Sequence, residues 1–575
     1  MIYIGEEKRM SYFLKQTKQG NRIFLQISET TYNKITKKSS NKCYKKLGYL
    51  DALISDEMPD PISYYNEEAK KLNKKRIEQI EKEKVIKIGK DPTRNIGYFL
   101  VKDMYNTLGI EKEMCPMKYM NDFTYPISSL VEALTYSRIV MPCSKLKTYN
   151  EVLPYLYEDY DFSLDQIYDG LDFIGSRYSQ FIEIINYCID KKYGRNTSKS
   201  YFDCTNYYFE IDFEFEDKQK GPSKENRSNP IIGQALLLDA DAIPMSMKMY
   251  PGNESEKPKI RELIKELKET NNIKGKTIQV ADKGLNCGDN IYDALLHKDG
   301  YIFSQSVLQL EEKEKAWVLL EDQYEEVKDK DGNLLYKIKA CVDDFVIKVT
   351  NKEGKKVSVT IRQKRVATFN PSLANKKKIE INKLVDKAMG LCHSEAKKEE
   401  YGESSKYVKF IDEEGKKATA VINQDKIEKD LKYAGYNLIV SSEIDMSKHE
   451  IYRVYHNLWK IEDTFRILKS QLDARPVYLQ NKNRIYGHFL ICYYAVTLLR
   501  LLEEKVFKNV FSIYELKDII RGLKILKGDE RNTNLTVASK SIDKICEMFK
   551  FNINYYYLSD KDINKLFNYK YRIKK

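Results

Sequence analysis

The segment YFDCTNYYFE, residues 201–210, alternates with a period of two. Tyr201, Asp203 and Tyr207 fall on one face of this pattern, and Phe202 falls on the other. A period of two predicts a β-strand. Because an ionised carboxylate is costly to bury, an acid in the middle of a strand needs a compensating partner, and a metal ion would supply one.

The residues after this strand continue an α/β pattern. Two strands joined by a short turn predict, together with the first, an antiparallel meander, and two helices then alternate with two further strands. The predicted segments are the strands Gly233–Leu238 and Ile243–Tyr250, a helix that begins near Ser255, the strand Ile278–Ala281, the helix Asn290–Leu296 and the strand Tyr301–Gln305. The order β, β, β, α, β, α, β predicts a sheet covered by helices.

A second acid, Asp282, stands where the strand Ile278–Ala281 ends and a loop begins. This is a common position for ligands in open α/β sheets. For Asp203 or Asp282 taken alone, a solvated acid on a strand is an equally good interpretation. The two acids become informative only together with a third.

The 575 residues exceed what one hydrophobic core organises, so we expect a multidomain α/β protein with helical regions towards both ends. Six segments are predicted from the patterning: residues 1–90, a small β-rich element with a basic stretch at 34–46 and a solvated, charged connector helix at 67–84; 91–197, an α-helical region with DNA-binding potential; 198–310, the first part of the α/β core; 311–430, a β-rich insertion; 431–480, the second part of the core, with a strand at 436–440 and a helix at 447–470; and 481–575, a helical C-terminal region.

The helix predicted in the second part of the core carries the third acid. Because seven residues are nearly two turns, Tyr455, Glu462 and Lys469 form one stripe, with Trp459 and Arg466 between them. The stripe combines an acid, two cations and two aromatic rings. An exposed helix with an ion pair between Glu462 and Arg466, worth about 0.3–0.5 kcal/mol, would also explain these residues.

Charge favours a polyanionic partner. The chain has 98 Lys and Arg against 85 Asp and Glu, a net charge of +13. Each cation that meets a phosphate releases condensed counterions, so an excess of this size points towards nucleic acid. A soluble, Lys-rich protein without such a partner is the simpler alternative.

Cysteine usage and hydropathy bear on the compartment. The ten cysteines are scattered without a CxxC pair, and no charged segment followed by an apolar one stands at Met1, so we expect a reducing cytosol. The longest apolar run, Phe489–Leu499, falls short of the ~18 residues that a membrane span requires. We therefore expect a buried helix there and no membrane partner.

Together, the three acid-bearing elements resemble the DDE insertion-sequence transposases of the branch that includes the Tn-five and insertion-sequence-four groups. The resemblance covers roughly residues 201–502. Members carry a first Asp in a strand, a second at a strand end, a β-rich insertion, and a helix with the pattern Tyr-x2-Arg-x3-Glu-x6-Lys. Tyr455, Glu462 and Lys469 match that spacing, but Leu458 stands at the Arg position.

The departure at Leu458 leaves one phosphate contact unassigned. Arg453, Lys460 or Arg466 are candidates to replace it. A subgroup of the same family looks similar in this respect, because it shares the core Ile-Glu-x2-Phe-Arg-x-Leu-Lys and a following Arg-Pro-Val-Tyr, here residues 475–478.

The resemblance implies a fold, a site and a reaction. The fold would be an RNase H-like mixed sheet with flanking helices, interrupted by the insertion. Asp203, Asp282 and Glu462 would be the catalytic residues and would hold two Mg²⁺ or Mn²⁺ ions. Four residues would bind DNA: Tyr455 and Lys469 on phosphates, Arg466 beside them, and Trp459 on a base displaced from the duplex, although Trp459 would equally suit core packing.

The implied function is a DNA transposase that cleaves insertion-sequence ends and joins them to target DNA. Its partners would be double-stranded DNA, as terminal inverted repeats and target, and a second copy of the chain, because two ends must be paired before joining. We expect it in a bacterial cytoplasm, associated with the nucleoid. A metal-dependent nuclease that cuts without joining, and a domesticated DNA-binding protein, are the alternatives.

Overall fold

The computed structural model divides the chain into two compact units, Met1–Pro92 and Thr93–Lys575. It describes residues 8–33, 38–56, 58–84, 91–120, 123–225, 227–393, 398–411, 419–528 and 531–572.

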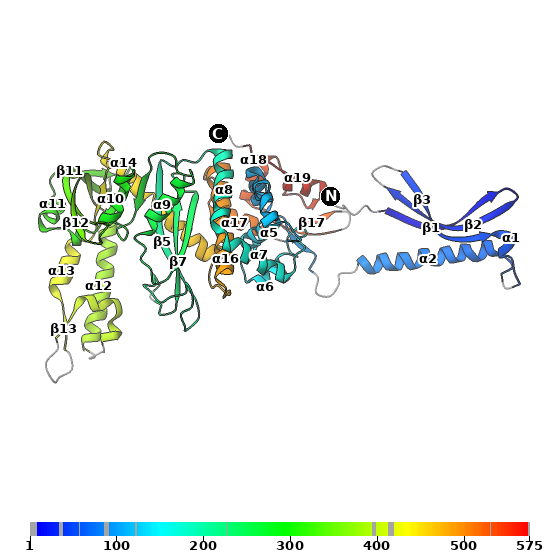
Figure 1. Ribbon diagram of the computed structural model, residues 1–575, viewed down its shortest axis with the longest axis horizontal. Helices are drawn as coiled ribbons and strands as arrows, with labels where there is room; N and C mark the ends of the chain where they lie inside the picture. The colour runs from blue at the N-terminus through cyan, green and yellow to red at the C-terminus, as the bar shows by residue number, and fades with distance from the viewer. Residues whose placement is uncertain are drawn as a thin grey trace. The chain divides into compact units, whose positions relative to one another are not determined.

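The first unit is a three-stranded antiparallel sheet with a helix beside it, so the predicted β-rich element is confirmed (Figure 1). Of the predicted basic stretch, residues 34–37 lie outside the described residues, and the rest belongs to the third strand. The elements are β1 (Lys8–Gln19), β2 (Arg22–Asn33), β3 (Lys38–Tyr49), α1 (Leu50–Leu53) and α2 (Pro61–Lys84).

The charged connector helix is solvated as expected on one face, but its other face is covered. Helix α2 packs on β1, and Asn73 forms two hydrogen bonds with the backbone of Tyr12, at 2.8 and 2.7 Å. Ala69 is buried in the same contact face. The apolar stripe of α2 contains Ile62, Tyr65, Ala69 and Leu72, but the predicted connector began at residue 67 and therefore left out the first half of this stripe.

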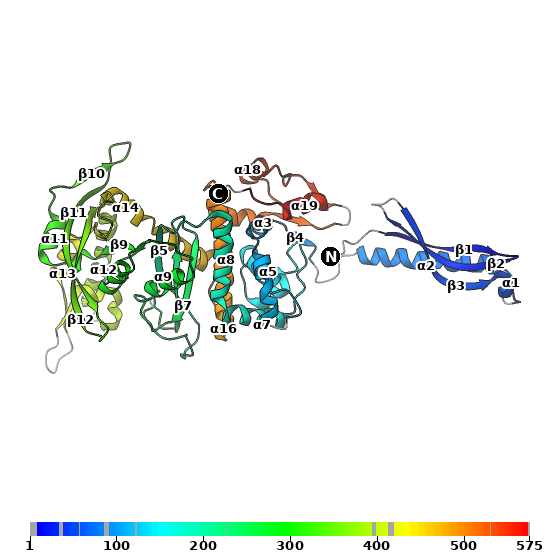
Figure 2. The same ribbon diagram turned by 45° about the horizontal axis from the view of Figure 1, so that its top comes forward.

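The second unit begins and ends with helices that share one hydrophobic core. Helix α16 packs on α5, α7 and α8, and Figures 1 and 2 both show α16 lying beside α8. The helices are α3 (Phe99–Leu108), α4 (Ile110–Met114), α5 (Ile127–Val140), α6 (Lys145–Lys147), α7 (Leu164–Ser176), α8 (Tyr178–Tyr193), α16 (Lys482–Leu501), α17 (Ile513–Gly522), α18 (Lys540–Phe549) and α19 (Asp560–Phe567). A small sheet joins the two regions and contains β4 (Thr93–Asn95), β16 (Lys524–Leu526), β17 (Asn532–Asn534) and β18 (Tyr557–Leu558).

The apolar run in α16 belongs to a longer helix than we predicted. Within the described residues, one helix, Lys482–Val506, has the length and composition to cross a membrane, and its apolar window is entirely buried inside the protein. Arg500, which ended the predicted run, is also buried, because it pairs with Asp463 at 2.7 Å and Glu503 at 2.6 Å. The helix is buried as expected, and Arg500 is buried with it through these two ion pairs.

The centre of the second unit is a nine-stranded mixed sheet of order β10-β11-β12-β15-β9-β8-β5-β6-β7. Strands β5, β6 and β7 form the predicted antiparallel meander. Strands β8 and β9 run parallel to β5. These elements are β5 (Lys199–Tyr208), β6 (Ile231–Leu238), β7 (Pro244–Pro251), α9 (Lys259–Glu269), β8 (Ile278–Ala281), α10 (Gly288–Leu296) and β9 (Gly300–Gln305).

The predicted insertion is only partly β-rich. Its long strands extend the central sheet, because β12 pairs with β15, which pairs with β9. The remainder contains two helices that pack together with a small hairpin (Figure 1). The elements are α11 (Glu312–Leu319), β10 (Glu325–Lys328), β11 (Leu334–Thr350), β12 (Lys356–Phe369), α12 (Pro371–His393), β13 (Val408–Ile411), β14 (Thr419–Ile422), α13 (Gln424–Lys432) and β15 (Tyr436–Ser441).

The helix expected at residues 447–470 is present as two consecutive helices, α14 (Lys448–His456) and α15 (Trp459–Arg466), followed by a π-helical turn at Ile467–Gln471. Ser447 caps the first helix by accepting a hydrogen bond from the backbone N–H of Glu450. Helix α14 packs on β8 and β9, and α15 packs on β5 and β6. The helix therefore crosses the strands that carry the two aspartates.

Candidate active site

Asp203 and Asp282 are neighbours across two parallel strands. In the register of β5 and β8, Phe202 lies opposite Ala281, and each aspartate is the next residue along its strand. Adjacent strands lie about 4.8 Å apart, so the two carboxylates start from neighbouring positions at one edge of the sheet. This adjacency follows from the predicted strand order.

Asp203 lies in an environment that disfavours its negative charge. Burial, together with the negative charges of Glu256 and Asp282, raises the pKa of Asp203 to about 6. The nearby ammonium of Lys224 and the backbone N–H of Cys204, which donates to Asp203 Oδ1 at 2.7 Å, act in the opposite direction. An acid held this way gains from any additional cation.

Asp282 is oriented by the helix that crosses it. The Tyr455 hydroxyl donates to Asp282 Oδ1 at 3.1 Å. Burial, followed by the charge of Asp282, raises the pKa of Tyr455, so the phenol stays protonated and remains a donor. The first residue of the predicted stripe therefore contacts an aspartate here, whereas we expected it on a DNA phosphate.

Glu462 is exposed on α15, seven residues after Tyr455. Partial burial and then the charge of Asp282 raise the pKa of Glu462. Asp282 is thus within electrostatic range of both Asp203 and Glu462. Among the described residues, however, no group of three His, Cys, Asp or Glu side chains lies close enough to hold a metal ion.

A lysine ammonium group lies beside the carboxylate of Asp203. Lys224, in the loop between β5 and β6, lies 3.8 Å from Asp203 Oδ1 and 3.4 Å from a carboxylate oxygen of Glu256. Its ammonium also donates to the carbonyl of Cys204. This positively charged group neutralises two acids where the strand edge opens.

Glu256 reaches the site from the turn after β7. Gly252 in that turn packs so closely against β6 that a Cβ would lie 2.2 Å from the carbonyl oxygen of Ile231. Its N–H donates to the carbonyl of Asp217 at 3.1 Å, which ties the turn to the loop that carries Lys224. The tight turn thereby fixes the approach of Glu256 to the acid cluster.

A glutamate likewise stands beside the basic end of the stripe. Lys469 Nζ lies 3.3 Å from Glu225 Oε1, and the guanidinium of Arg475 pairs with the same oxygen. Burial lowers the pKa of Lys469, although the charge of Glu225 opposes this. Adjacent loop residues of opposite sign thus contact opposite ends of the site.

Trp459 and Arg466 both face solvent. The Trp459 side chain is 55% exposed, so the core-packing alternative is wrong. Arg466 Nη1 lies 3.6 Å from Asp463 Oδ1, and within the described residues the alternative ion pair with Glu462 does not form. Both side chains are accessible to a ligand that approaches α15.

Four residues of the site were missed by the sequence patterns. Lys224 and Glu225 lie between the first two predicted strands, where no role was assigned, and Glu256 falls at the start predicted for the helix near Ser255, which in the structure begins at Lys259. Arg475 was noted only as part of a motif. The signal that was present is the pair of opposite charges in a loop that directly follows the first acidic strand.

The sequence matches a family model described as a transposase DDE domain over residues 204–498. Asp282 and Glu462 lie inside the match, and Asp203 immediately precedes it. No curated protein matches the chain. Among solved structures, the chain is similar to one described as a piggyBac transposase synaptic complex with hairpin DNA, with 9% identity, a TM-score of 0.35, and coverage of 74% of this chain and 78% of that one.

The family match covers just over half of the 575 residues and spans the central sheet, the insertion and the helix of Glu462. This chain therefore belongs to the transposase DDE domain family and is an enzyme of the nuclease and transferase class.

Proposed function

We propose that this enzyme is an insertion-sequence transposase with an RNase H-like core, which cleaves the ends of its element and joins them to target DNA. The proposal for the core is supported by five strands of the sheet. The meander β5-β6-β7 is followed by two strands parallel to β5, and β5 lies between the two sets.

One observation carries the proposed catalytic site. Asp203 and Asp282 stand on neighbouring parallel strands, and the charge of Asp282 acts on both Asp203 and Glu462. The charge of Asp282 opposes the ionisation of both Asp203 and Glu462, a cost in free energy that separate solvated positions would avoid. Their gathering favours a positively charged ligand.

The donor set fits divalent cations. Carboxylate oxygens are the ligands preferred by Mg²⁺ and Mn²⁺, and the ammonium of Lys224 beside Asp203 indicates that this position already attracts positive charge. Asp203, Asp282 and Glu462 would hold the ions. Bound ions would lower the pKa of an attacking water or hydroxyl and stabilise the leaving oxygen.

The chain's own residues orient the acids and bind the substrate. Tyr455 holds the carboxylate of Asp282 through its hydroxyl. Lys469 and Arg475 already bind one shared anionic oxygen, Glu225 Oε1, and a DNA phosphate would replace that oxygen. Arg475 thereby fills the role left open by Leu458, which is buried.

The exposed Trp459 is available to stack on an unpaired base, an interaction worth about 1–3 kcal/mol. We further propose that the protein acts as a homodimer, because joining requires two paired DNA ends.

The test is cleavage of DNA that carries the element's own ends, with Mg²⁺ or Mn²⁺. Asp203→Asn, Asp282→Asn and Glu462→Gln should each lower the rate by at least about a thousandfold while DNA binding persists. Glu269→Gln, an exposed acid on α9, is the matched control and should cleave normally. Full cleavage by any one of the three variants would refute the site, and cleavage without joining to a plasmid target would reduce the function to a nuclease.

A further inference from the structure

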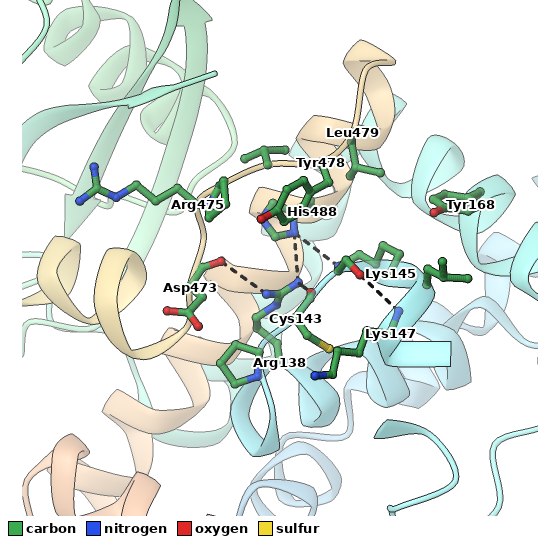
Figure 3. A pocket seen from close by; sticks show the side chains of 15 residues that line it. Arg138, Cys143, Lys145, Lys147, Tyr168, Asp473, Arg475, Tyr478, Leu479 and His488 are labelled. Carbon is green, nitrogen blue, oxygen red and sulfur yellow. Dashed lines mark hydrogen bonds between the residues drawn. The ribbon is translucent and has the colours of Figure 1, made fainter. Parts of the chain in front are cut away.

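A cavity of about 800 Å³ lies outside the acid cluster. Its walls come from the end of α5 and the short helix α6, from the segment at residues 473–479, and from the start of α16 (Figure 3). A volume of this size accommodates a ligand as large as a nucleotide.

Two buried cations face this cavity. The exposed fractions of Arg138 and Lys145 are 4% and 5%. Figure 3 shows both side chains converging on His488, whose Nδ1 lies 3.4 Å from Arg138 Nη2 and 3.4 Å from Lys145 Nζ. Arg138 also donates to the carbonyl oxygen of Cys143 at 3.0 Å.

The shared acceptor carries no charge. His488 Nε2 lies 3.1 Å from the carbonyl of Ala474, so this nitrogen bears the hydrogen and Nδ1 accepts from the cations. Burial and the two neighbouring positive charges keep the pKa of His488 well below its usual range. Among the described residues, no carboxylate forms an ion pair with Arg138 or Lys145. Two basic groups are therefore buried against neutral oxygen and nitrogen atoms alone.

Burying an unpaired charge is strongly unfavourable, so such a cluster favours an anion that enters from solvent. Lys147 lies exposed at the rim, where it is already paired with Glu151 at 3.4 Å. Tyr168 and Tyr478 also line the cavity, and Tyr478 is 72% exposed. A ligand that satisfies both groups of residues carries a phosphate for the cations and a planar ring for the tyrosines.

The cavity adjoins the basic end of the active site. Arg475 lines it, yet its guanidinium pairs with Glu225, which also pairs with Lys469. In Figure 3 the Arg475 side chain points away from His488. One segment therefore connects the cavity to the cations that the proposed function assigns to DNA.

We propose that this cavity binds one nucleotide of a DNA strand, with its phosphate on Lys145 and Arg138 and its base against Tyr168 and Tyr478. The inference rests on the proposed function for the source of the strand, because only DNA bound at the acid cluster would deliver a nucleotide beside Arg475. The chemistry of recognition, a phosphate with an attached base, belongs to the cavity itself.

The experiment measures binding by the full chain carrying Asp203→Asn, without added metal, so that no cleavage is needed. The probes are a fluorescent six-residue oligothymidylate, dTMP, thymidine and inorganic phosphate. Lys145→Met should weaken oligonucleotide binding about 10- to 100-fold, the loss expected for a charge-assisted hydrogen bond. Lys147→Met, the rim control, should change it less than about threefold.

Tyr478→Ala provides a second variant that folds safely, because the side chain is exposed. It should weaken the oligonucleotide and dTMP but leave inorganic phosphate unchanged. Equal losses for Lys145→Met and Lys147→Met, or no loss for either Lys145→Met or Tyr478→Ala, would overturn the site. Equal affinities for dTMP and the oligonucleotide would assign the cavity to free nucleotides and overturn the DNA-strand assignment.

Failure of this inference is distinguishable from failure of the proposed function. Normal metal-dependent cleavage, combined with oligonucleotide binding that does not depend on Lys145, would refute only the proposed nucleotide site in the cavity. Lys145-dependent binding combined with full cleavage by Asp203→Asn removes only the catalytic assignment.

Discussion

Replacing Lys145 with methionine should stabilise the second unit. Burial, reinforced by the charge of Arg138, lowers the pKa of Lys145 from 10.5 to about 7. At about 1.4 kcal/mol per tenfold change in proton affinity, this burial costs roughly 4–5 kcal/mol wherever the amine is protonated. Methionine occupies a similar volume and forgoes one hydrogen bond to His488 worth about 1 kcal/mol. The net gain should be about 2–4 kcal/mol.

The gain should depend on pH with a definite sign. Lys145 faces Arg138 on α5, Cys143 on the preceding loop, and His488 and Cys492 on α16. Below pH 7 the buried amine is protonated and the cost is complete. Between pH 7 and 10.5 the unfolded chain retains a proton that the folded chain has lost, so wild-type stability rises with pH and the advantage of the variant shrinks.

Urea midpoints at pH 6, 8 and 10 measure this effect, with Lys147→Met as the exposed control. The Lys145 variant should gain most at pH 6 and least at pH 10, while the control stays within about 0.5 kcal/mol at every pH. A Lys145→Met protein that is destabilised at pH 6, or whose gain is the same at pH 6 and pH 10, would refute the unpaired charge. Such a result would indicate that Arg138 and Lys145 stabilise the folded state.

Three further predictions concern the acid cluster and its surroundings. Lys224→Met removes a partly exposed cation whose pairing with the acids is worth about 1 kcal/mol, so the Mn²⁺ affinity measured by calorimetry should rise about fivefold. An unchanged affinity would show that Lys224 does not compete with the metal ion. Glu225→Gln frees two basic partners, and the slope of log DNA affinity against log salt should steepen by about 1–2; a constant slope would remove these cations from the DNA site. Trp459→Ala should leave the urea midpoint unchanged but weaken complexes with an unpaired base about 5- to 150-fold; equal loss on fully paired DNA would exclude stacking.

The core could be predicted because its signals are local. The strand Ile278–Ala281 has the bounds expected from its short apolar run, and the meander follows from three strand-like segments, the first with a period of two and the last two joined by a short turn. The helix α12 was missed, although its buried residues recur at helical spacing. Those residues are few, and charged residues separate them: Ala374, Ile381, Val385 and Ala388. A narrow apolar seam in a charged segment resembles the alternation of an exposed strand.

The candidate site was predictable only where spacing along one element determines it. The stripe of Tyr455, Glu462 and Lys469 is set by helical periodicity alone. The contacts of its members are not, because the partners of Tyr455 and Lys469 lie 173 and 244 residues away in sequence. The buried pair at Arg138 and Lys145 was equally invisible, since nothing in a local pattern states that a lysine lacks a carboxylate.

The loop between β5 and β6 explains how the site that we propose for ions and DNA is stable without either. Lys224 neutralises the acids, and the next residue, Glu225, neutralises the cations. Because the two residues are adjacent, one cannot move far without the other, so a ligand that displaces either charge also exposes the complementary half of the site. A divalent ion at Asp203 and a phosphate at Lys469 would each replace a contact of the same sign rather than add a new one. The measured affinity of each ligand is therefore reduced by the free energy of the loop contact that it displaces. Binding of the first ligand lowers the free-energy cost of displacing the loop for the second.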